Sequence, residues 1–195
     1  MRDLRPDDRD KIRRWRNKPG VGLHQFTDHY IGVEEHERWF ARMMNDPTVR
    51  YWVITWSGED VGIADLYDIN PRHQRCYWAF YIAEEGFRGR GIGSLVEYFV
   101  LEHVFETLKL NKLCCEVLAS NPAVTKMHER FAFREEGYLR GHVIKHGEPA
   151  DVHAMAVLRE EWVERRPSIQ KLLTGMKLLA PDAVQVATAA GRGAS

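Results

Sequence analysis

The chain has 195 residues and no formal net charge, because 28 lysines and arginines balance 28 aspartates and glutamates. This balance argues against a general electrostatic affinity for nucleic acid or for an anionic membrane, so neither is an expected partner. The length suits one domain with a substantial core. No run approaches the ~18 apolar residues of a membrane-spanning helix, and the first residues lack the apolar stretch of a secretory signal.

The cysteines also bear on the setting in which the protein works. There are three, Cys76, Cys114 and Cys115; two are adjacent, and all lie in apolar, strand-like runs. An odd number in such runs predicts buried free thiols in a reducing cytoplasm. Because the sequence has neither a C-x-x-C motif nor paired histidines at ligand spacing, we expect no metal site.

The first part of the chain is predicted to begin with a short strand that ends at residues 4–5, followed by helices. Pro6 suits a helix start, so residues 7–17 are predicted to be helical. Residues 21–30 are expected to be irregular, and residues 33–44 form a second predicted helix.

Strands then dominate. Residues 50–56, 61–69 and 76–83 are rich in aromatic and β-branched side chains and are separated by turn signals, which predicts an antiparallel meander. The elements expected after them are a helix over 95–108, a strand over 113–119, a helix over 123–131, and two closing strands over 134–145 and 152–159.

Composition changes at Pro167, which suggests a division into a domain of residues 1–166 and a C-terminal helix and tail of residues 167–195. Apolar residues from Ile169 to Leu179 have the spacing of a short amphipathic helix. We expect this helix either to pack on its own domain or to be disordered, with binding of a partner as the alternative, and we expect the Ala- and Gly-rich stretch after Pro181 to be disordered.

A glycine-rich stretch, residues 88–94, connects the third predicted strand of the meander to the helix over 95–108. Three of its residues, Gly89, Gly91 and Gly93, are glycines, which allow a sharp turn and leave amide N–H groups uncovered. With the N-terminal end of the helix they make a cradle for a diphosphate, and Arg88 and Arg90 add positive charge. The alternative is a tight strand–helix connection that binds nothing.

The pattern Arg-x-x-Gly-x-Gly resembles the acetyl-CoA pyrophosphate loop of the GNAT acyltransferase superfamily. A second segment, Asn121 to Arg130, resembles the N-x-x-A-x-x-x-Y-E-K run of that superfamily, with Val124 in place of the alanine. The resemblance covers roughly residues 2–162. It implies an α/β (α+β) GNAT fold, whose mixed central sheet is splayed at the acetyl-CoA site and flanked by helices. It also implies an acetyl-CoA-dependent N-acetyltransferase without a metal.

The resemblance assigns the cosubstrate contacts. Pantetheine would lie beside the end of the strand before the loop, where a backbone N–H serves as the oxyanion donor; the loop amides would hold the pyrophosphate, and an asparagine would bind the pantetheine arm. The residues at these positions are Ile82, Glu84, Arg88, Gly89, Arg90, Gly91, Gly93, Ser94 and Asn121.

Two residues are candidates for acid–base chemistry. Glu116 interrupts an apolar strand, where a carboxylate is costly unless it has a role or a partner; the resemblance puts a water-mediated base at this position. An outward-facing or salt-bridged glutamate is the alternative. His128 stands where the family usually has the tyrosine that protonates the leaving thiolate. Either it serves as the acid, or water does and His128 is a packing or a surface residue.

Further pieces, including Trp15-Arg16-Asn17 and Glu34-Glu35-His36, resemble the branch that acetylates UDP-linked 4-amino-4,6-dideoxy sugars in pseudaminic acid synthesis. That branch implies nucleotide contacts by Arg16 and His36 and, more weakly, a substrate contact by Tyr67. Alternatively, Arg16 is a helix C-terminal charge and His36 lies on a solvated helix face. His24 in the irregular segment could also reach the cleft.

Other acceptors and other roles stay open. The same chemistry on a ribosomal-protein or other protein N-terminus, or on a small polyamine, would favour an acidic groove. A non-catalytic acyl-CoA-binding module is a third reading, because His128 departs from the family pattern. A homodimer is compatible with each of these.

Overall fold

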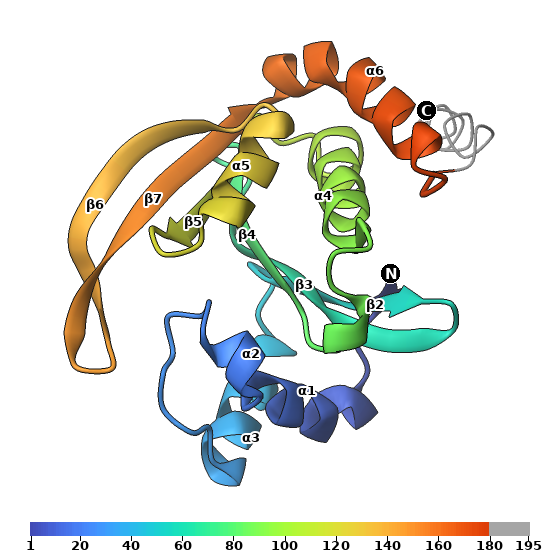
Figure 1. Cartoon of the computed structure of the whole chain (residues 1–195). Helices are drawn as coiled ribbons and strands as arrows, with labels where there is room; N and C mark the ends of the chain where they lie inside the picture. Colours follow the sequence, from blue (N-terminus) through green and yellow to red (C-terminus); the bar gives the residue numbers. More distant parts are fainter. Residues whose placement is uncertain (180–195) are drawn as a thin grey trace.

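The computed structural model describes residues 1–179 and has a seven-stranded mixed sheet with helices on both faces (Figure 1). The strand order is β1-β2-β3-β4-β5-β7-β6. The strands are β1 (Arg2–Asp3), β2 (Arg50–Trp56), β3 (Glu59–Asn70), β4 (Arg75–Ile82), β5 (Lys112–Leu118), β6 (Arg134–Lys145) and β7 (Glu148–Leu158). The helices are α1 (Arg9–Arg16), α2 (Pro19–Gly22), α3 (Val33–Met43), α4 (Ile92–Glu102), α5 (Pro122–Arg130) and α6 (Arg159–Gly175). The expected fold class and the antiparallel meander β2-β3-β4 are confirmed.

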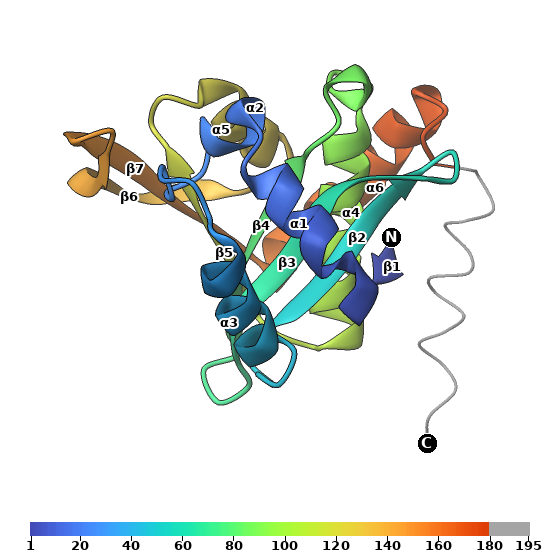
Figure 2. The same ribbon diagram turned by 90° about the horizontal axis from the view of Figure 1, so that it is seen from below.

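The sheet separates two sets of helices, and each set has its own core. Helices α4, α5 and α6 cover one face, whereas α1, α2 and α3 cover the other (Figures 1 and 2). The larger core contains Trp78 of β4, Val100 of α4 and Trp162 of α6. The smaller core contains Ile12 and Phe40 against Val53 and Ile63 of the sheet. Since successive side chains of a strand alternate between faces, each central strand serves both cores.

The contact between β4 and β5 is unlike the others in the sheet. These strands pair in parallel over only three residue pairs, from Arg75–Lys112 to Tyr77–Cys114. Both continue further, β4 to Ile82 and β5 to Leu118, each held by its other neighbour. The two strands therefore diverge, and the splayed sheet that the family resemblance implied is present.

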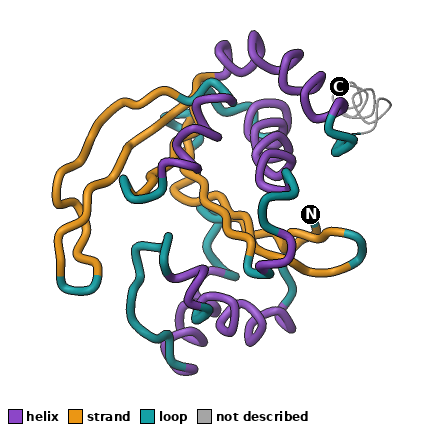
Figure 3. Tube along the Cα trace, in the orientation of Figure 1, coloured by secondary structure: helices purple, strands orange, loops and turns teal. Residues whose placement is uncertain are grey.

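Two differences from the expected elements lie in the helices. Residues 19–22, at the start of the segment expected to be irregular, form the short helix α2, because Pro19 sits well at a helix start. Helix α4 starts at Ile92 and ends at Glu102, and one turn of π-helix, His103–Thr107, follows it. The tube view separates these helices from the loops around them (Figure 3).

The long β6–β7 hairpin reaches across to the segment that follows α2. Its Lys145 Nζ donates to the backbone carbonyls of Gly22, at 2.9 Å, and Gln25, at 2.7 Å. The backbone N–H of His146 also donates to Asp28. The hairpin tip and the segment after α2 are thus joined, although more than a hundred residues separate them in the sequence.

The C-terminal helix α6 continues through Pro167, the position of the expected division. Ile169, Leu173 and Leu179 beyond it belong to the same core cluster as Trp162 before it. Packing of this helix on its own domain is confirmed. The expected tail after Pro181 lies outside the described residues.

All three cysteines are buried and free, as predicted. Burial raises the pKa of the Cys76 thiol to about 12, so it stays protonated at neutral pH. None of the described helices is long and apolar enough to cross a membrane. Within residues 1–179, no group of three or more His, Cys, Asp and Glu side chains is placed to hold a metal ion.

The packing of α6 yields a stability prediction. Leu173 is fully buried, whereas its neighbour Leu172 is 38% exposed. Leu173→Ala is expected to lower the free energy of unfolding in urea by about 2–5 kcal/mol, because it leaves a cavity in the core. Leu172→Ala is the control, with a change of roughly 0.5 kcal/mol or less. Equal effects would show that the residues beyond Pro167 do not belong to the domain core.

Candidate active site

Two cavities meet at β4; the first is lined from both faces of the sheet, through the gap between β4 and β5, and the second lies on one face. The first, of about 740 Å³, lies between α4, α5 and the diverging ends of β4 and β5. The second, of about 760 Å³, lies on the face covered by α1 and α3. The residues that line both cavities are Arg16, Gln25, Thr27, Ala79 and Tyr81. A molecule bound in one cavity is thus next to a molecule bound in the other.

The glycine loop forms one end of the first cavity. Gly89 and Gly91 have φ of +73° and +80°, in the left-handed region that favours glycine, and Gly91 precedes the first residue of α4. A Cβ on Gly93 would lie 3.3 Å from the ring of Phe80, so this glycine lets α4 approach β4 closely. The loop residues that line the cavity are Arg88, Gly89, Gly91, Gly93 and Ser94. The free N–H groups at the start of α4 therefore face a cavity, as a diphosphate cradle requires.

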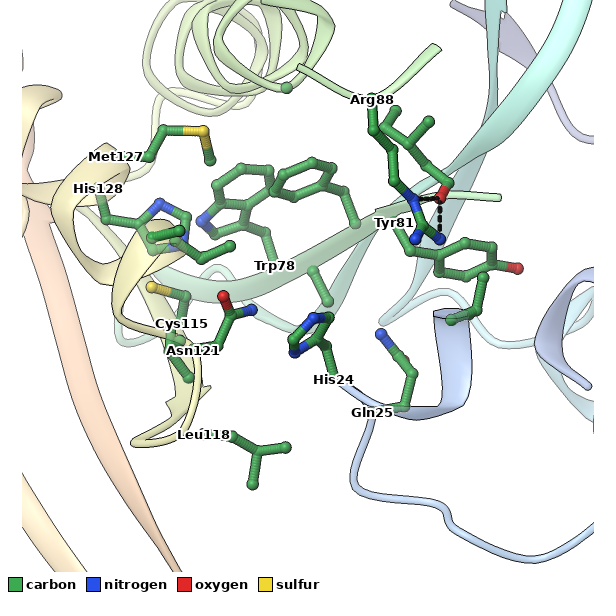
Figure 4. A pocket seen from close by; sticks show the side chains of 18 of the residues that line it. His24, Gln25, Trp78, Tyr81, Arg88, Cys115, Leu118, Asn121, Met127 and His128 are labelled. Carbon is green, nitrogen blue, oxygen red and sulfur yellow. Dashed lines mark hydrogen bonds between the residues drawn. The ribbon is translucent and has the colours of Figure 1, made fainter. Parts of the chain in front are cut away.

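The two arginines of the loop differ in position. The Arg88 side chain donates from Nε and Nη2 to the carbonyl of Ile82, at 3.1 and 3.0 Å (Figure 4). It therefore ties the loop to the end of β4. Arg90 is exposed, stacks on the ring of Phe87 at 5.3 Å and does not line the first cavity. The expected contact of Arg90 with a diphosphate at the cradle stays a prediction.

Of the three backbone N–H groups expected to supply the oxyanion donor, at residues 82–84, two have partners within the sheet. The backbone N–H groups of Ala83 and Glu84 both donate to the Val61 carbonyl, at 2.8 and 3.3 Å, so they are not available to a thioester. The Glu84 carboxylate accepts from Trp15 and Lys18 and does not line the first cavity. Since backbone groups alternate in direction along a strand, the N–H of Ile82 instead faces β5, across the gap.

Asn121 borders the first cavity with a free side chain. It precedes the first residue of α5, yet its amide does not cap the helix. No hydrogen bond joins that amide to another part of the chain that the structure describes, and Figure 4 shows the side chain directed into the cavity. A carboxamide can both donate and accept, which suits the amide groups of a pantetheine arm.

Glu116 is half-buried and lines the first cavity, so it is neither fully exposed nor, within residues 1–179, part of a salt bridge. It follows the last β4–β5 pair, Tyr77–Cys114, by two residues. It therefore lies level with Ala79 of β4, across the gap. Tyr67 of β3 lies close enough to Glu116 for the two groups to interact. Burial raises the pKa of the Tyr67 phenol most, and the negative charge of Glu116 raises it further.

His128 is buried and bound to a second ionisable residue that sequence reasoning missed. Its Nδ1–H donates to Oε1 of Glu97 on α4 at 2.7 Å, and Glu97 is completely buried. The Trp78 indole packs edge-on against the imidazole at 5.3 Å between ring centres. His128 lines the first cavity beside Cys115, as Figure 4 shows. The bond to Glu97 fixes the ring so that Nε2 is left for another partner.

Charge explains the protonation of this pair. Burial by itself would lower the pKa of His128, but the Glu97 carboxylate, with a contribution from Cys115, raises it to about 10. The imidazole therefore keeps its proton at neutral pH. The surface-histidine alternative is wrong, because only 3% of His128 is exposed.

The expected substrate residues occupy different places. Arg16 lines both cavities, bonds the Gln25 side chain, and lies over the Tyr81 ring at 6.0 Å. Tyr67 lines the first cavity together with His24. Arg16, Tyr67 and His24 thus gather around the junction of the cavities.

His36 has a structural bond that the sequence did not indicate. It is only 3% exposed, and its Nε2–H donates to the Arg9 carbonyl at 2.7 Å, which joins α3 to α1. Burial lowers the pKa of His36. The solvated-face alternative is therefore wrong. His36 lines the second cavity, and because its Nε2 is bonded to Arg9, only the rest of the ring can contact a molecule there.

Two carboxylates, Glu97 and Asp65, were not predicted as site residues, although the sequence contains signals for both. Glu97 follows Gly93 by four residues and precedes Val100 by three, so it lies in the apolar stripe of α4. Asp65 follows Ile63 by two residues along β3, so the two side chains lie on the same, buried face of the strand. Both are charged residues at positions that the helix and strand periods assign to a core.

The comparisons agree with this geometry. The model of the acetyltransferase (GNAT) domain family matches residues 1–134. Spermidine N(1)-acetyltransferase of Escherichia coli (strain K12) is 24% identical over 183 residues, which cover 92% of this chain and 95% of that protein. Acetyltransferase PseH of Campylobacter jejuni (strain 81-176) is 25% identical over 131 residues, 67% of this chain and 80% of that protein. Spermidine N-acetyltransferase from Vibrio cholerae, in complex with CoA and spermine, superimposes with a TM-score of 0.77 at 24% identity, over 83% of this chain and 96% of that chain.

Because the family model matches more than half of its length, the chain belongs to the GNAT acetyltransferase family. It is an acetyl-CoA-dependent N-acetyltransferase, with acetyl-CoA as its cosubstrate.

The Glu97–His128 pair yields a prediction about protonation. Glu97→Gln removes the charge that holds the proton on the imidazole, so burial is expected to dominate and the pKa of His128 to fall below ~6.5. Histidine-selective NMR from pH 6 to 9 would measure this: wild-type His128 stays charged throughout, whereas the variant is neutral. A charged ring in the variant at pH 8 would contradict the role given to Glu97.

Proposed function

We propose that the protein transfers the acetyl group of acetyl-CoA to the 4-amino group of a UDP-linked 4-amino-4,6-dideoxy sugar. The observation that carries the proposal is the lining of the second cavity. Arg16, Arg38 and Arg42 border it, together with two carboxylates, Glu35 of α3 and Asp65 of β3. This excess of guanidinium groups suits an acceptor that carries a diphosphate as well as an amine.

Aromatic side chains complete that cavity. Trp39, Tyr51 and Tyr81 line it, and their faces suit a planar base such as uracil. The resemblance of the Trp15-Arg16-Asn17 and Glu34-Glu35-His36 pieces to the amino-sugar branch supports the same acceptor. So does the similarity to acetyltransferase PseH.

In this proposal the first cavity holds acetyl-CoA, with its pyrophosphate on the loop from Arg88 to Ser94 and its pantetheine arm at Asn121. Glu116, through a water molecule, takes a proton from the acceptor's ammonium group. The free amine then attacks the thioester carbon, and the carbon–sulfur bond breaks as the amide forms. The leaving thiolate receives the proton on Nε2 of His128. The second amine proton is lost to solvent, and the proton held by Glu116 passes through solvent to His128, so both residues return to their starting states.

A polyamine is the second candidate acceptor. The spermidine acetyltransferase of Escherichia coli matches this chain over 92% of its length, more than acetyltransferase PseH does. The carboxylates Glu35, Asp65 and Glu116 would face a polyamine that crosses both cavities. Three arginines in the second cavity oppose such a cation, which is why we place this candidate second.

The proposal extends to assembly. A spermidine N-acetyltransferase from Vibrio cholerae with this fold is described as dodecameric. We propose that this chain also self-associates, with a homodimer as the smallest unit. Light scattering during gel filtration would measure the mass directly.

The test of the acceptor is free-thiol release from acetyl-CoA with three acceptors: the UDP-4-amino-4,6-dideoxy sugar, spermidine, and ribosomal-protein N-terminal peptides. We expect turnover with the sugar and competition by UDP. Turnover with spermidine alone and no competition by UDP would replace the first candidate with the second. Turnover with the peptide alone would also overturn the proposal. Acetyl-CoA binding without thiol release from any acceptor would favour a binding module.

Glu116→Gln tests the proposed base. We expect kcat to fall by about 10²-fold, because the amine is no longer deprotonated in the complex, with little change in the KM for acetyl-CoA. Glu164→Gln, at an exposed position of α6, is the matched control and should leave kcat unchanged. An unchanged kcat in Glu116→Gln, measured at saturating substrates, would remove Glu116 from the reaction.

A further inference from the structure

The floor of the second cavity contains a carboxylate in the middle of the sheet. Asp65 of β3 pairs with Tyr51 of β2 on one side and with Ala79 of β4 on the other. Directly paired residues share a face, so Asp65 lies in a row across three strands on the side covered by α1 and α3. It lines the second cavity.

The Asp65 carboxylate lacks a counterion in direct contact. Within residues 1–179, no hydrogen bond or ion pair joins it to another side chain. The positive charge that acts on it, without direct contact, is that of Arg16. Arg16 is itself bonded to Gln25 and lies over the Tyr81 ring. Burial raises the pKa of Asp65 to about 7, against the lowering effect of Arg16. An unpaired, half-buried carboxylate is a cost to the folded state that a ligand can remove.

Its position relative to the reacting groups is specific. Ala79, the β4 partner of Asp65, lines both cavities. On the other side of Ala79, across the gap, lies Glu116. The charges of both Glu116 and Asp65 raise the pKa of the Tyr67 phenol, so both carboxylates lie near Tyr67. The two carboxylates therefore lie on either side of the place where the cavities meet. An amine that enters from the second cavity passes Asp65 before it reaches the thioester.

We propose that Asp65 is the binding site for the acceptor's ammonium group, a primary alkylammonium, and holds it at the junction of the two cavities. This inference rests on the proposed function for the location of the acceptor, but not on the identity of the acceptor. Asp65 binds the charged amine, and Glu116 takes its proton. Ion pairing with the ammonium supplies the partner that Asp65 lacks in the chain alone.

The test is Asp65→Asn, which keeps the size of the side chain and removes its charge. Steady-state kinetics with the acceptor that wild type turns over should show KM for that acceptor raised at least tenfold, with KM for acetyl-CoA within twofold. The hydroxyl analogue of the sugar nucleotide, which lacks the amine, should inhibit wild type and variant equally. Glu59→Gln, at the exposed end of the same strand, is the matched control and should behave as wild type.

Stability separates binding from a structural role. The pKa of Asp65 is higher in the folded protein than the ordinary value of 3.8, so its burial destabilises the fold increasingly as pH rises from 3.8 to about 7, and the full cost is present above that pH. Asp65→Asn should therefore raise the melting temperature at pH 8, by roughly 2–4 °C, while it weakens acceptor binding. A lower melting temperature together with weaker acetyl-CoA binding would show a structural role and overturn the proposal.

A pH profile of wild type tests the inference without a substitution. As pH falls from 8 to 6, Asp65 takes up a proton, and the acceptor KM should rise about tenfold as its ionised fraction falls by that factor. The ionisable groups that face Asp65 or share its cavity are Arg16, Glu35, His36, Arg38, Arg42, Tyr51, Tyr67, Tyr81 and Glu116. The same rise should be absent in Asp65→Asn and in the inhibition constant of the hydroxyl analogue. If the acceptor KM of Asp65→Asn still rose as pH falls, the titration would belong to one of the other groups, and the prediction that Asp65 causes it would be wrong.

The outcomes separate the two proposals. Turnover of spermidine alone, with an acceptor KM that depends on Asp65, would overturn the sugar-nucleotide proposal and support the ammonium site. Turnover of the UDP-sugar with an acceptor KM that Asp65→Asn leaves within twofold of wild type would support the function and overturn the ammonium site.

Discussion

The parallel pairing of β4 with β5 ends after three residue pairs, and the rest of the site depends on this short pairing. Beyond it the two strands are held only by their outer neighbours, so backbone groups that would pair within a continuous sheet are left facing a gap. The glycine loop, Asn121 and His128 all border that gap from the α4 and α5 side. On the other side the second cavity opens beneath α1 and α3. A sheet that stayed closed would separate the two cavities by a layer of backbone.

The cost of burying charge is the second constraint on the site, and the Glu97–His128 pair and Asp65 meet it in different ways. Glu97 and His128 are both buried but bonded to each other, so each charge compensates for the other and the proton is retained. Asp65 has no such partner in the described chain, and its proton affinity is raised for that reason. One carboxylate holds the proton of His128 inside the protein, while the other has no side-chain partner within residues 1–179.

The sequence predicted much of the fold, because local signals determine element order and the R-x-x-G-x-G and Asn121 segments are recognisable. It could not predict features that depend on register or on distant contacts. Glu97 and His128 are 31 residues apart, and nothing local pairs them. The register of β3 with β4 places the N–H groups of Ala83 and Glu84 on Val61, which no sequence pattern reveals. A composition shift at Pro167 suggested a boundary, whereas tertiary packing carries α6 through that proline.

The link between Lys145 and the segment after α2 has a consequence for how such an enzyme changes specificity. One ammonium group satisfies two backbone carbonyls, so a hairpin near the end of the domain fixes a loop near its beginning. That loop supplies Gln25 and Thr27 to both cavities. Transplanting the loop from a relative, without the hairpin that positions it, would move the right side chains into the wrong place. The loop and the hairpin that holds it are therefore a matched pair of segments, and a graft of one requires a graft of the other.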